Sequence, residues 1–206
     1  MGKRRLGFAL TGSFCTYDKV FPLLRELARD YEVTPIFSAA AAATDSRFGL
    51  AQDFMSEAEA ICGRPALTTL REVEPIGPKK LLDLLLVAPC TGNTLAKLAA
   101  GIADGAVTMA CKSQLRNGRP LVLAVSTNDG LGAAAENVGR LLARKHVYFV
   151  PFGQDDPAGK PTSLVADFSL APAALAAALR GEQVQPLLLG HRPAAEQGEA
   201  GAPIRA

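Results

Sequence analysis

Apolar residues in this chain gather in short runs, and segments with helical periodicity separate these runs. The clearest runs cover residues 83–88 and 121–125 and contain almost no polar position. Such continuous apolarity predicts strands that are covered on both faces, as in the middle of a parallel sheet. Shorter runs at residues 6–10, 32–38 and 147–150 predict three further strands. Pro35 weakens the second of these, since proline cannot donate to a sheet.

The segments between the runs carry apolar residues at helical spacing. In residues 16–29, for example, Val20, Leu23 and Leu27 fall on one face, and Pro22 lies near the start, where a missing N–H costs little. We expect further helices over residues 48–62, 95–100, 104–115 and 132–145, with a proline-containing connection at residues 64–80. Alternating strands and helices predict an α/β fold: a Rossmann-like three-layer sandwich of parallel βαβ units.

The pattern indicates one domain over residues 1–189. Residues 190–206 are rich in Gly, Ala, Pro and Glu and have no periodicity. We therefore expect them to form a disordered tail.

Composition narrows the class of protein further. Hydrophobic residues make up 49% of the 206 residues, and the formal charge of +2 favours neither nucleic acid nor an anionic membrane as a partner. The four cysteines form no Cys-x-x-Cys pair, and the basic N-terminus precedes an apolar run too short for a signal peptide or a membrane span. We expect a reduced, cytoplasmic protein.

The candidate chemistry lies where the predicted strands end. In open α/β sheets, ligands bind outside the carboxyl ends of the strands, and glycine lets a backbone approach a phosphate there. Small hydroxyl and amide residues stand at three such ends, and Ser38 adds a fourth. The candidate cofactor-binding residues are Thr11, Gly12, Ser13, Ser38, Pro89, Thr91, Gly92, Asn93, Thr94, Ser126, Thr127 and Asn128. Because Ser, Thr and Asn are also common helix N-caps, simple capping is the alternative at each loop.

Other kinds of site are disfavoured. There is no Gly-x-Gly-x-x-Gly after the first strand, no Gly-Lys-Ser/Thr phosphate loop and no Gly-x-Ser-x-Gly elbow. The two histidines, His146 and His191, are far apart, so we expect no metal site. Arg47 follows a polar loop and is a candidate for binding a substrate carboxylate, which a guanidinium matches in bidentate fashion.

Two of these loops resemble the homo-oligomeric flavin-containing cysteine decarboxylase family, which includes flavin prenyltransferases. They are the hydroxyl-rich first loop at residues 11–13 and the Pro-x-x-x-Asn-Thr loop at residues 89–94. Within this group, a longer resemblance to the dipicolinate synthase B subunits spans roughly residues 3–189. The segments that carry it are residues 7–18, 44–49, 88–94, 115–120, 126–129, 148–155 and 160–165.

The resemblance implies a flavodoxin-like fold, bound FMN and a homo-oligomer of trimer size or larger. It also implies a separate A subunit, similar to NAD(P)-dependent dehydrogenases. The two would form dipicolinate from a dihydrodipicolinate-type dicarboxylate in the mother cell of a sporulating bacterium. Decarboxylation and prenyl transfer fit less well. No histidine precedes His146, and Ser126 stands near where the prenyltransferases place an arginine. The functions left open are a flavin-binding redox subunit, a non-catalytic partner subunit, and a decarboxylase or prenyltransferase on the same scaffold.

Overall fold

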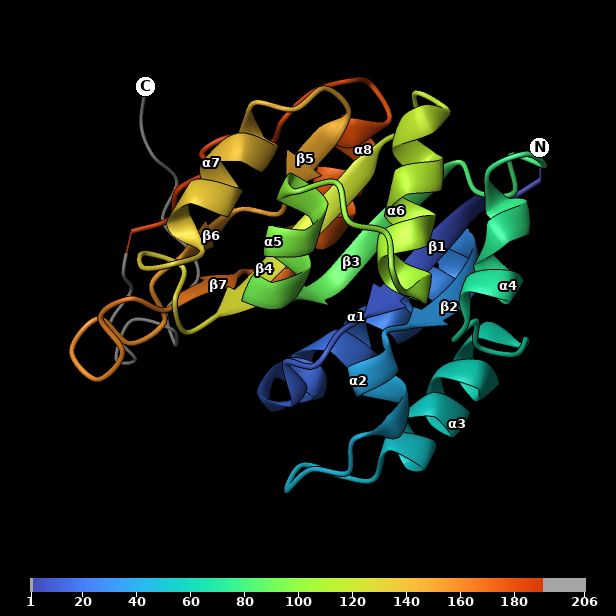
Figure 1. Cartoon of the computed structure of the whole chain (residues 1–206), viewed down its shortest axis with the longest axis horizontal. Helices are drawn as coiled ribbons and strands as arrows, with labels where there is room; N and C mark the ends of the chain where they lie inside the picture. Colours follow the sequence, from blue (N-terminus) through green and yellow to red (C-terminus); the bar gives the residue numbers. More distant parts are fainter. Residues whose placement is uncertain (1, 191–206) are drawn as a thin grey trace.

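The computed structural model describes residues 2–190, which contain a seven-stranded sheet in the order β2-β1-β3-β4-β7-β6, with β5 also paired to β4 (Figure 1). The strands are β1 (Arg4–Leu10), β2 (Tyr31–Phe37), β3 (Leu84–Cys90), β4 (Leu121–Thr127), β5 (Val147–Phe149), β6 (Phe152–Gly153) and β7 (Leu164–Ala166). Strands β1 to β5 pair in parallel, whereas β7 runs antiparallel to β4 and β6. The predicted α/β class is confirmed, and the sheet, which we expected to be parallel, is mostly parallel.

Helices cover both faces of the sheet and give the predicted three layers (Figure 1). The α-helices are α1 (Tyr17–Asp30), α2 (Ala39–Ala43), α3 (Ala51–Cys62), α4 (Leu70–Val73), α5 (Gly92–Ala99), α6 (Ala106–Arg116), α7 (Ala135–Leu142) and α8 (Ala171–Ala178). Three short 3-10 turns are η1 (Phe14–Thr16), η2 (Glu74–Ile76) and η3 (Phe168–Leu170). Helices α5, α6 and α7 lie on one face, and α1 and α8 on the other.

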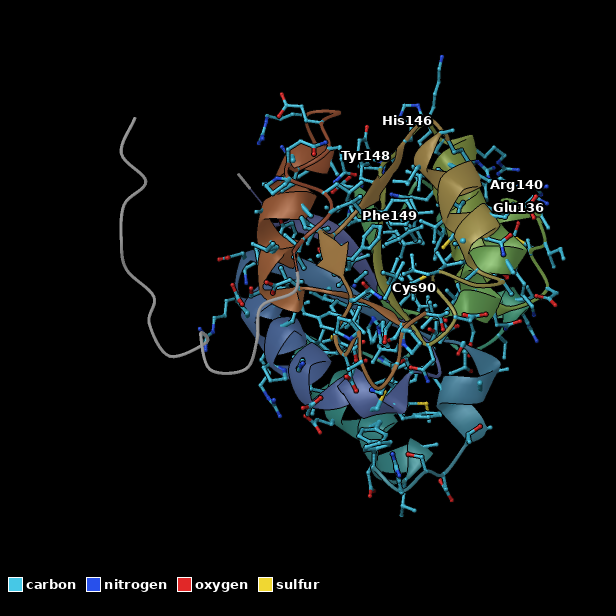
Figure 2. All side chains as sticks on the ribbon, turned by 90° about the vertical axis from the view of Figure 1, so that its left-hand side faces the viewer. Cys90, Glu136, Arg140, His146, Tyr148 and Phe149 are labelled. Carbon is cyan, nitrogen blue, oxygen red and sulfur yellow. The ribbon has the colours of Figure 1, made fainter. Side chains whose placement is uncertain are left out.

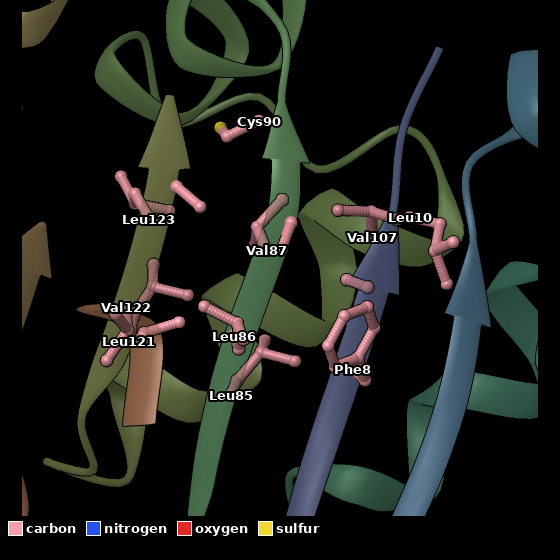
Figure 3. Close-up of a cluster of buried hydrophobic side chains, with 14 of the residues drawn as sticks. Phe8, Leu10, Leu85, Leu86, Val87, Cys90, Val107, Leu121, Val122 and Leu123 are labelled. Atoms are coloured by element: carbon pink, nitrogen blue, oxygen red, sulfur yellow. The ribbon is translucent and has the colours of Figure 1, made fainter. Parts of the chain in front are cut away.

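Strand β3 lies at the centre of the core. All seven of its residues are buried, because β1 and β4 flank it and helices cover both of its faces. Figure 3 shows side chains of β1, β3 and β4 packed together with Val107 of α6. This burial explains why the sequence of β3 is apolar without alternation.

The structure corrects several local expectations. Pro22 lies inside α1, beyond its first turn, rather than near its start. Pro35 fits in β2 because β2 is the outer strand, and its carbonyl faces away from β1 to accept the Leu67 N–H at 2.9 Å. Helix α8 and the antiparallel strands β6 and β7 were not predicted.

The predicted tail lies outside the described residues, apart from its first residue, Gly190. Within residues 2–190, we find no helix long and apolar enough to span a bilayer.

Candidate functional site

The carboxyl ends of β1 and β3 are joined by one buried hydroxyl. Thr11 Oγ1 donates to the Pro89 carbonyl oxygen at 2.6 Å and accepts the Thr91 N–H at 3.2 Å. The Tyr17 hydroxyl, in turn, donates to the Thr11 carbonyl at 3.1 Å. The three contacts fix the first two candidate loops relative to each other. They also leave the Thr11 hydroxyl little capacity for a ligand.

A cavity of about 460 Å³ opens beside this junction. The parallel strands follow the order 2-1-3-4-5, in which the chain reverses direction across the sheet between β1 and β3. Ligands of doubly wound sheets bind at this reversal. The cavity is lined by Thr11, Gly12, Ser38, Ala39, Ala40, Thr91, Asn93, Thr94, Lys97, Asp104, Gly105, Ala106, Val107 and Thr108.

The N-termini of α5 and α6 both open into the cavity. Thr91 is the N-cap of α5, and its hydroxyl accepts the Thr94 N–H at 3.3 Å; Gly105 is the N-cap of α6. The first N–H groups of a helix lack intrahelical partners, and the helix dipole is positive at that end. This arrangement favours an anionic group such as a phosphate.

The structure therefore brings six of the twelve candidate cofactor residues to the cavity: Thr11, Gly12, Ser38, Thr91, Asn93 and Thr94. Capping, the alternative, also occurs. Ser38 Oγ accepts the Ala41 N–H at 3.2 Å, and Thr91 Oγ1 lies 3.0 Å from Thr94 Oγ1. Asn93 is exposed, so its amide lies at the solvent-facing part of the cavity.

The other six candidates lie nearby but do not line the cavity. Ser13 Oγ and Ser126 Oγ are 2.7 Å apart, which joins the ends of β1 and β4. Pro89 is buried in β3, and Gly92 packs against the loop after β4. Thr127 hydrogen-bonds to a carboxylate oxygen of Asp129, and Asn128 is exposed, with its carbonyl accepting Thr162 Oγ1 at 2.6 Å.

Arg47 is not brought to the cavity. It is exposed in the turn between α2 and α3, where its guanidinium lies 4.9 Å from the centre of the Phe48 ring. The turn is held by Ser46 and Gly49, whose backbones pair with each other.

Sequence reasoning missed the charged pair in the cavity. Lys97 Nζ lies 3.0 and 2.8 Å from the two carboxylate oxygens of Asp104, and this hydrogen bonding lowers the pKa of Asp104. Lys97 stands four residues after Asn93, so the two share a face of α5. That spacing was the available signal.

None of the four cysteines, nor His146, is among the residues that line the cavity. All four cysteines are free; Cys15 is exposed, and burial raises the pKa of the Cys90 thiol well above its ordinary value. Figure 2 shows His146 at the end of the sheet away from Cys90. Within residues 2–190, no cluster of His, Cys, Asp and Glu side chains is placed to hold a metal ion.

This geometry, a doubly wound sheet with a phosphate-compatible cavity at its β1–β3 reversal, agrees with a comparison with known families. The flavoprotein family model matches residues 1–161, and the chain belongs to the flavoprotein family.

More particularly, the chain is similar to the B subunit of dipicolinate synthase from Bacillus subtilis (strain 168). The identity is 44% over 187 residues, which cover 90% of this chain and 94% of that protein. It is also similar to the crystal structure of the dipicolinate synthase B subunit from Bacillus halodurans C, with 42% identity and a TM-score of 0.83, covering 91% and 96% of the two chains. The predicted resemblance is confirmed.

A more distant similarity concerns the fold alone. The FMN-dependent cysteine decarboxylase SpaF is 23% identical, with a TM-score of 0.62, and the match covers 86% of this chain and 95% of that one.

Proposed function

We propose that this chain is the flavin-binding B subunit of a dipicolinate synthase, and that FMN binds in the cavity at the β1–β3 reversal. The observation that carries the proposal is the convergence of the α5 and α6 N-termini, with the hydroxyls of Ser38, Thr91 and Thr94, on one cavity. Its volume lies within the range of about 300–1,000 Å³ that is typical of small-molecule sites.

The lining residues fit the two ends of an FMN molecule. The hydroxyls and free N–H groups would hold the phosphate, while Ala40, Ala106 and Val107 offer an apolar surface to the ring and exclude water. FMN, when bound, supplies hydride transfer through its ring system. The chain then needs to position the substrate and shield it, which hydroxyl, amide and apolar side chains can do.

The proposed substrate and partner follow from the similarity to the two B subunits. We propose a dihydrodipicolinate-type dicarboxylate as substrate and a dehydrogenase-like A subunit, which binds NAD(P), as partner. The chain would act as a homo-oligomer of trimer size or larger in the cytoplasm of the mother cell. Arg47 remains our candidate for a substrate carboxylate; since it does not line the cavity of its own chain, that role requires a substrate site that a second subunit completes.

Flavin titration tests the proposal. The purified chain should give a stoichiometric, protein-perturbed absorption spectrum with FMN. Asn93→Ala should weaken FMN binding by about fivefold, as expected for the loss of one hydrogen bond. Asn137→Ala, at a half-buried position of α7 that does not line the cavity, is the matched control and should bind FMN like the wild type. A spectrum of free flavin only, from folded protein, would overturn the proposal.

A second candidate, a non-catalytic partner subunit, is favoured by the side chains that line the cavity. Among those described, the ionisable groups are Lys97 and Asp104, and they are paired with each other, so neither is a free acid or base. Under this candidate, dipicolinate formation with the A subunit would continue unchanged after FMN is removed. Loss of turnover on FMN removal, and its return on FMN addition, would favour the redox subunit.

A further inference from the structure

Lys97 and Asp104 face each other across the edge of the cavity. Lys97 lies in α5, and Asp104 immediately precedes Gly105, the N-cap of α6. The ammonium reaches both carboxylate oxygens, at 3.0 and 2.8 Å, and the side chains are 33% and 53% exposed. Both residues line the cavity, so the pair belongs to its wall and not to a remote surface.

The two residues of the pair would interact with a phosphate in opposite ways. Among the described residues that line the cavity, Lys97 carries the single positive charge. A phosphate monoester carries close to two negative charges at neutral pH. It would be attracted by Lys97 and by the two helix N-termini, and repelled by Asp104, which holds the same ammonium.

We propose that Lys97 makes this cavity prefer a flavin that carries a phosphate monoester over an unphosphorylated one, and that Asp104 weakens this preference by competing for the Lys97 ammonium. The inference rests on the proposed flavin site and adds its specificity-determining residue. It differs from the sequence-based expectation, which assigned phosphate binding to hydroxyls and glycines.

A purely structural role for the pair makes a different prediction. If Lys97 and Asp104 only hold α5 against α6, removing either one breaks the same ion pair, and both variants should change in the same direction. If Lys97 attracts phosphate and Asp104 competes with it, the two variants should change in opposite directions. The role of the pair can therefore be tested by two substitutions, each of which removes a charge and nearly preserves the size and shape of the side chain.

The experiment measures dissociation constants for FMN and riboflavin by flavin fluorescence. Lys97→Met should weaken FMN binding by about fivefold to tenfold and leave riboflavin binding unchanged. Asp104→Asn should tighten FMN binding by about twofold to fivefold. Equal changes for both flavins, or the same direction of change in both variants, would overturn the inference.

Two further variants serve as controls. Lys145→Met removes the same charge from an exposed position just before β5, at the amino ends of the strands and so away from the cavity. It should keep the wild-type ratio of FMN to riboflavin affinity. If Lys97→Met does not fold, Lys97→Arg retains the charge and should retain the preference for FMN. Loss of that preference in Lys97→Arg would count against a role of charge.

Failure of the proposed function itself is distinguishable from failure of this inference. If the wild type binds neither flavin, the flavin proposal is wrong. The Lys97 proposal is then judged by the increase in Tm that inorganic phosphate causes. An increase that is present in the wild type and absent in Lys97→Met supports it, and no increase in the wild type overturns it.

Discussion

At the scale of single residues, Gly92 brings the start of α5 against the loop after β4. A Cβ atom at this position would lie 2.8 Å from Asp129 Oδ1 and 2.8 Å from Thr127 Oγ1. Contacts that short do not persist, so one of the two segments would have to move. Gly92 is therefore explained by close packing beside the cavity, whereas its predicted role in cofactor binding stays a prediction.

Gly92→Ala should destabilise the protein by about 1–3 kcal/mol, because overpacking forces backbone shifts. It should also weaken FMN binding, since the displaced segment begins α5. Gly139→Ala is the control: Gly139 is within α7, and a Cβ there meets nothing within 4 Å. It should stabilise the helix by about 0.5–1 kcal/mol. Urea unfolding measures both effects, and equal free energies of unfolding for the two variants would contradict this account.

The residues of the cavity were only partly predictable. Thr91, Asn93 and Thr94 could be found because strand ends rich in hydroxyls and amides are a local signal. Lys97 and Asp104 could not be paired from sequence, since their contact depends on how α5 packs beside α6. Lys97 stands four residues after Asn93 and shares its face of α5, but a lysine among apolar helical residues is usually a solvated position, and this spacing alone does not identify its partner.

At the scale of elements, Asp83 fixes the start of β3. Its carboxylate accepts the Arg5 backbone N–H at 2.9 Å, Arg5 Nη2 at 2.8 Å and Arg119 Nη1 at 3.3 Å. These contacts tie β3 to β1 and to the segment that leads into β4. The hydrogen bond from the Arg5 guanidinium holds the pKa of Asp83 below its ordinary value of 3.8.

Asp83→Asn should lower the free energy of unfolding at pH 7 by about 1–2 kcal/mol. Because the pKa is lowered by folding, this stabilisation is present above pH 3.8 and is lost as pH falls through the lowered pKa. Urea unfolding should thus show the same difference from wild type at pH 7 and pH 5, and a shrinking difference below pH 4. Glu136→Gln, which removes an exposed ion pair on α7 (Figure 2), should change stability by less than about 0.5 kcal/mol. A difference for Asp83→Asn that persists to pH 2 would refute the linkage.

The predictability of the elements depended on length and periodicity. The long apolar runs identified β3 and β4, and amphipathic spacing identified α1. Helix α8 has the sequence Ala-Pro-Ala-Ala-Leu-Ala-Ala-Ala, which is apolar on every side and so carries no helical period. Strands β6 and β7 have two and three residues, and their pairing with distant residues leaves no local signal.

At the scale of the whole molecule, a ligand that binds only the folded state raises its stability. FMN at a hundred times its dissociation constant should contribute about 2.7 kcal/mol. For a domain of this size, that corresponds to an increase in Tm of about 5–10 °C. Differential scanning fluorimetry measures the increase, and Asn93→Ala should show a smaller one at the same FMN concentration. An unchanged Tm at a concentration that saturates the absorption change would contradict binding to the native fold.

The two edges of the sheet affect how readily the protein aggregates at high concentration. Exposed strand margins are templates on which other chains add strands and aggregate. On one side, β2 is covered by Leu67, which pairs with Pro35 and Phe37, and Pro35 offers no N–H. On the other side, β5 and β7 both pair with the same edge of β4. The outermost strand, β6, has only two residues and also pairs with Leu188. The fold thus leaves little exposed strand edge for cross-β growth, and we expect copies of the chain to resist fibre formation at high concentration.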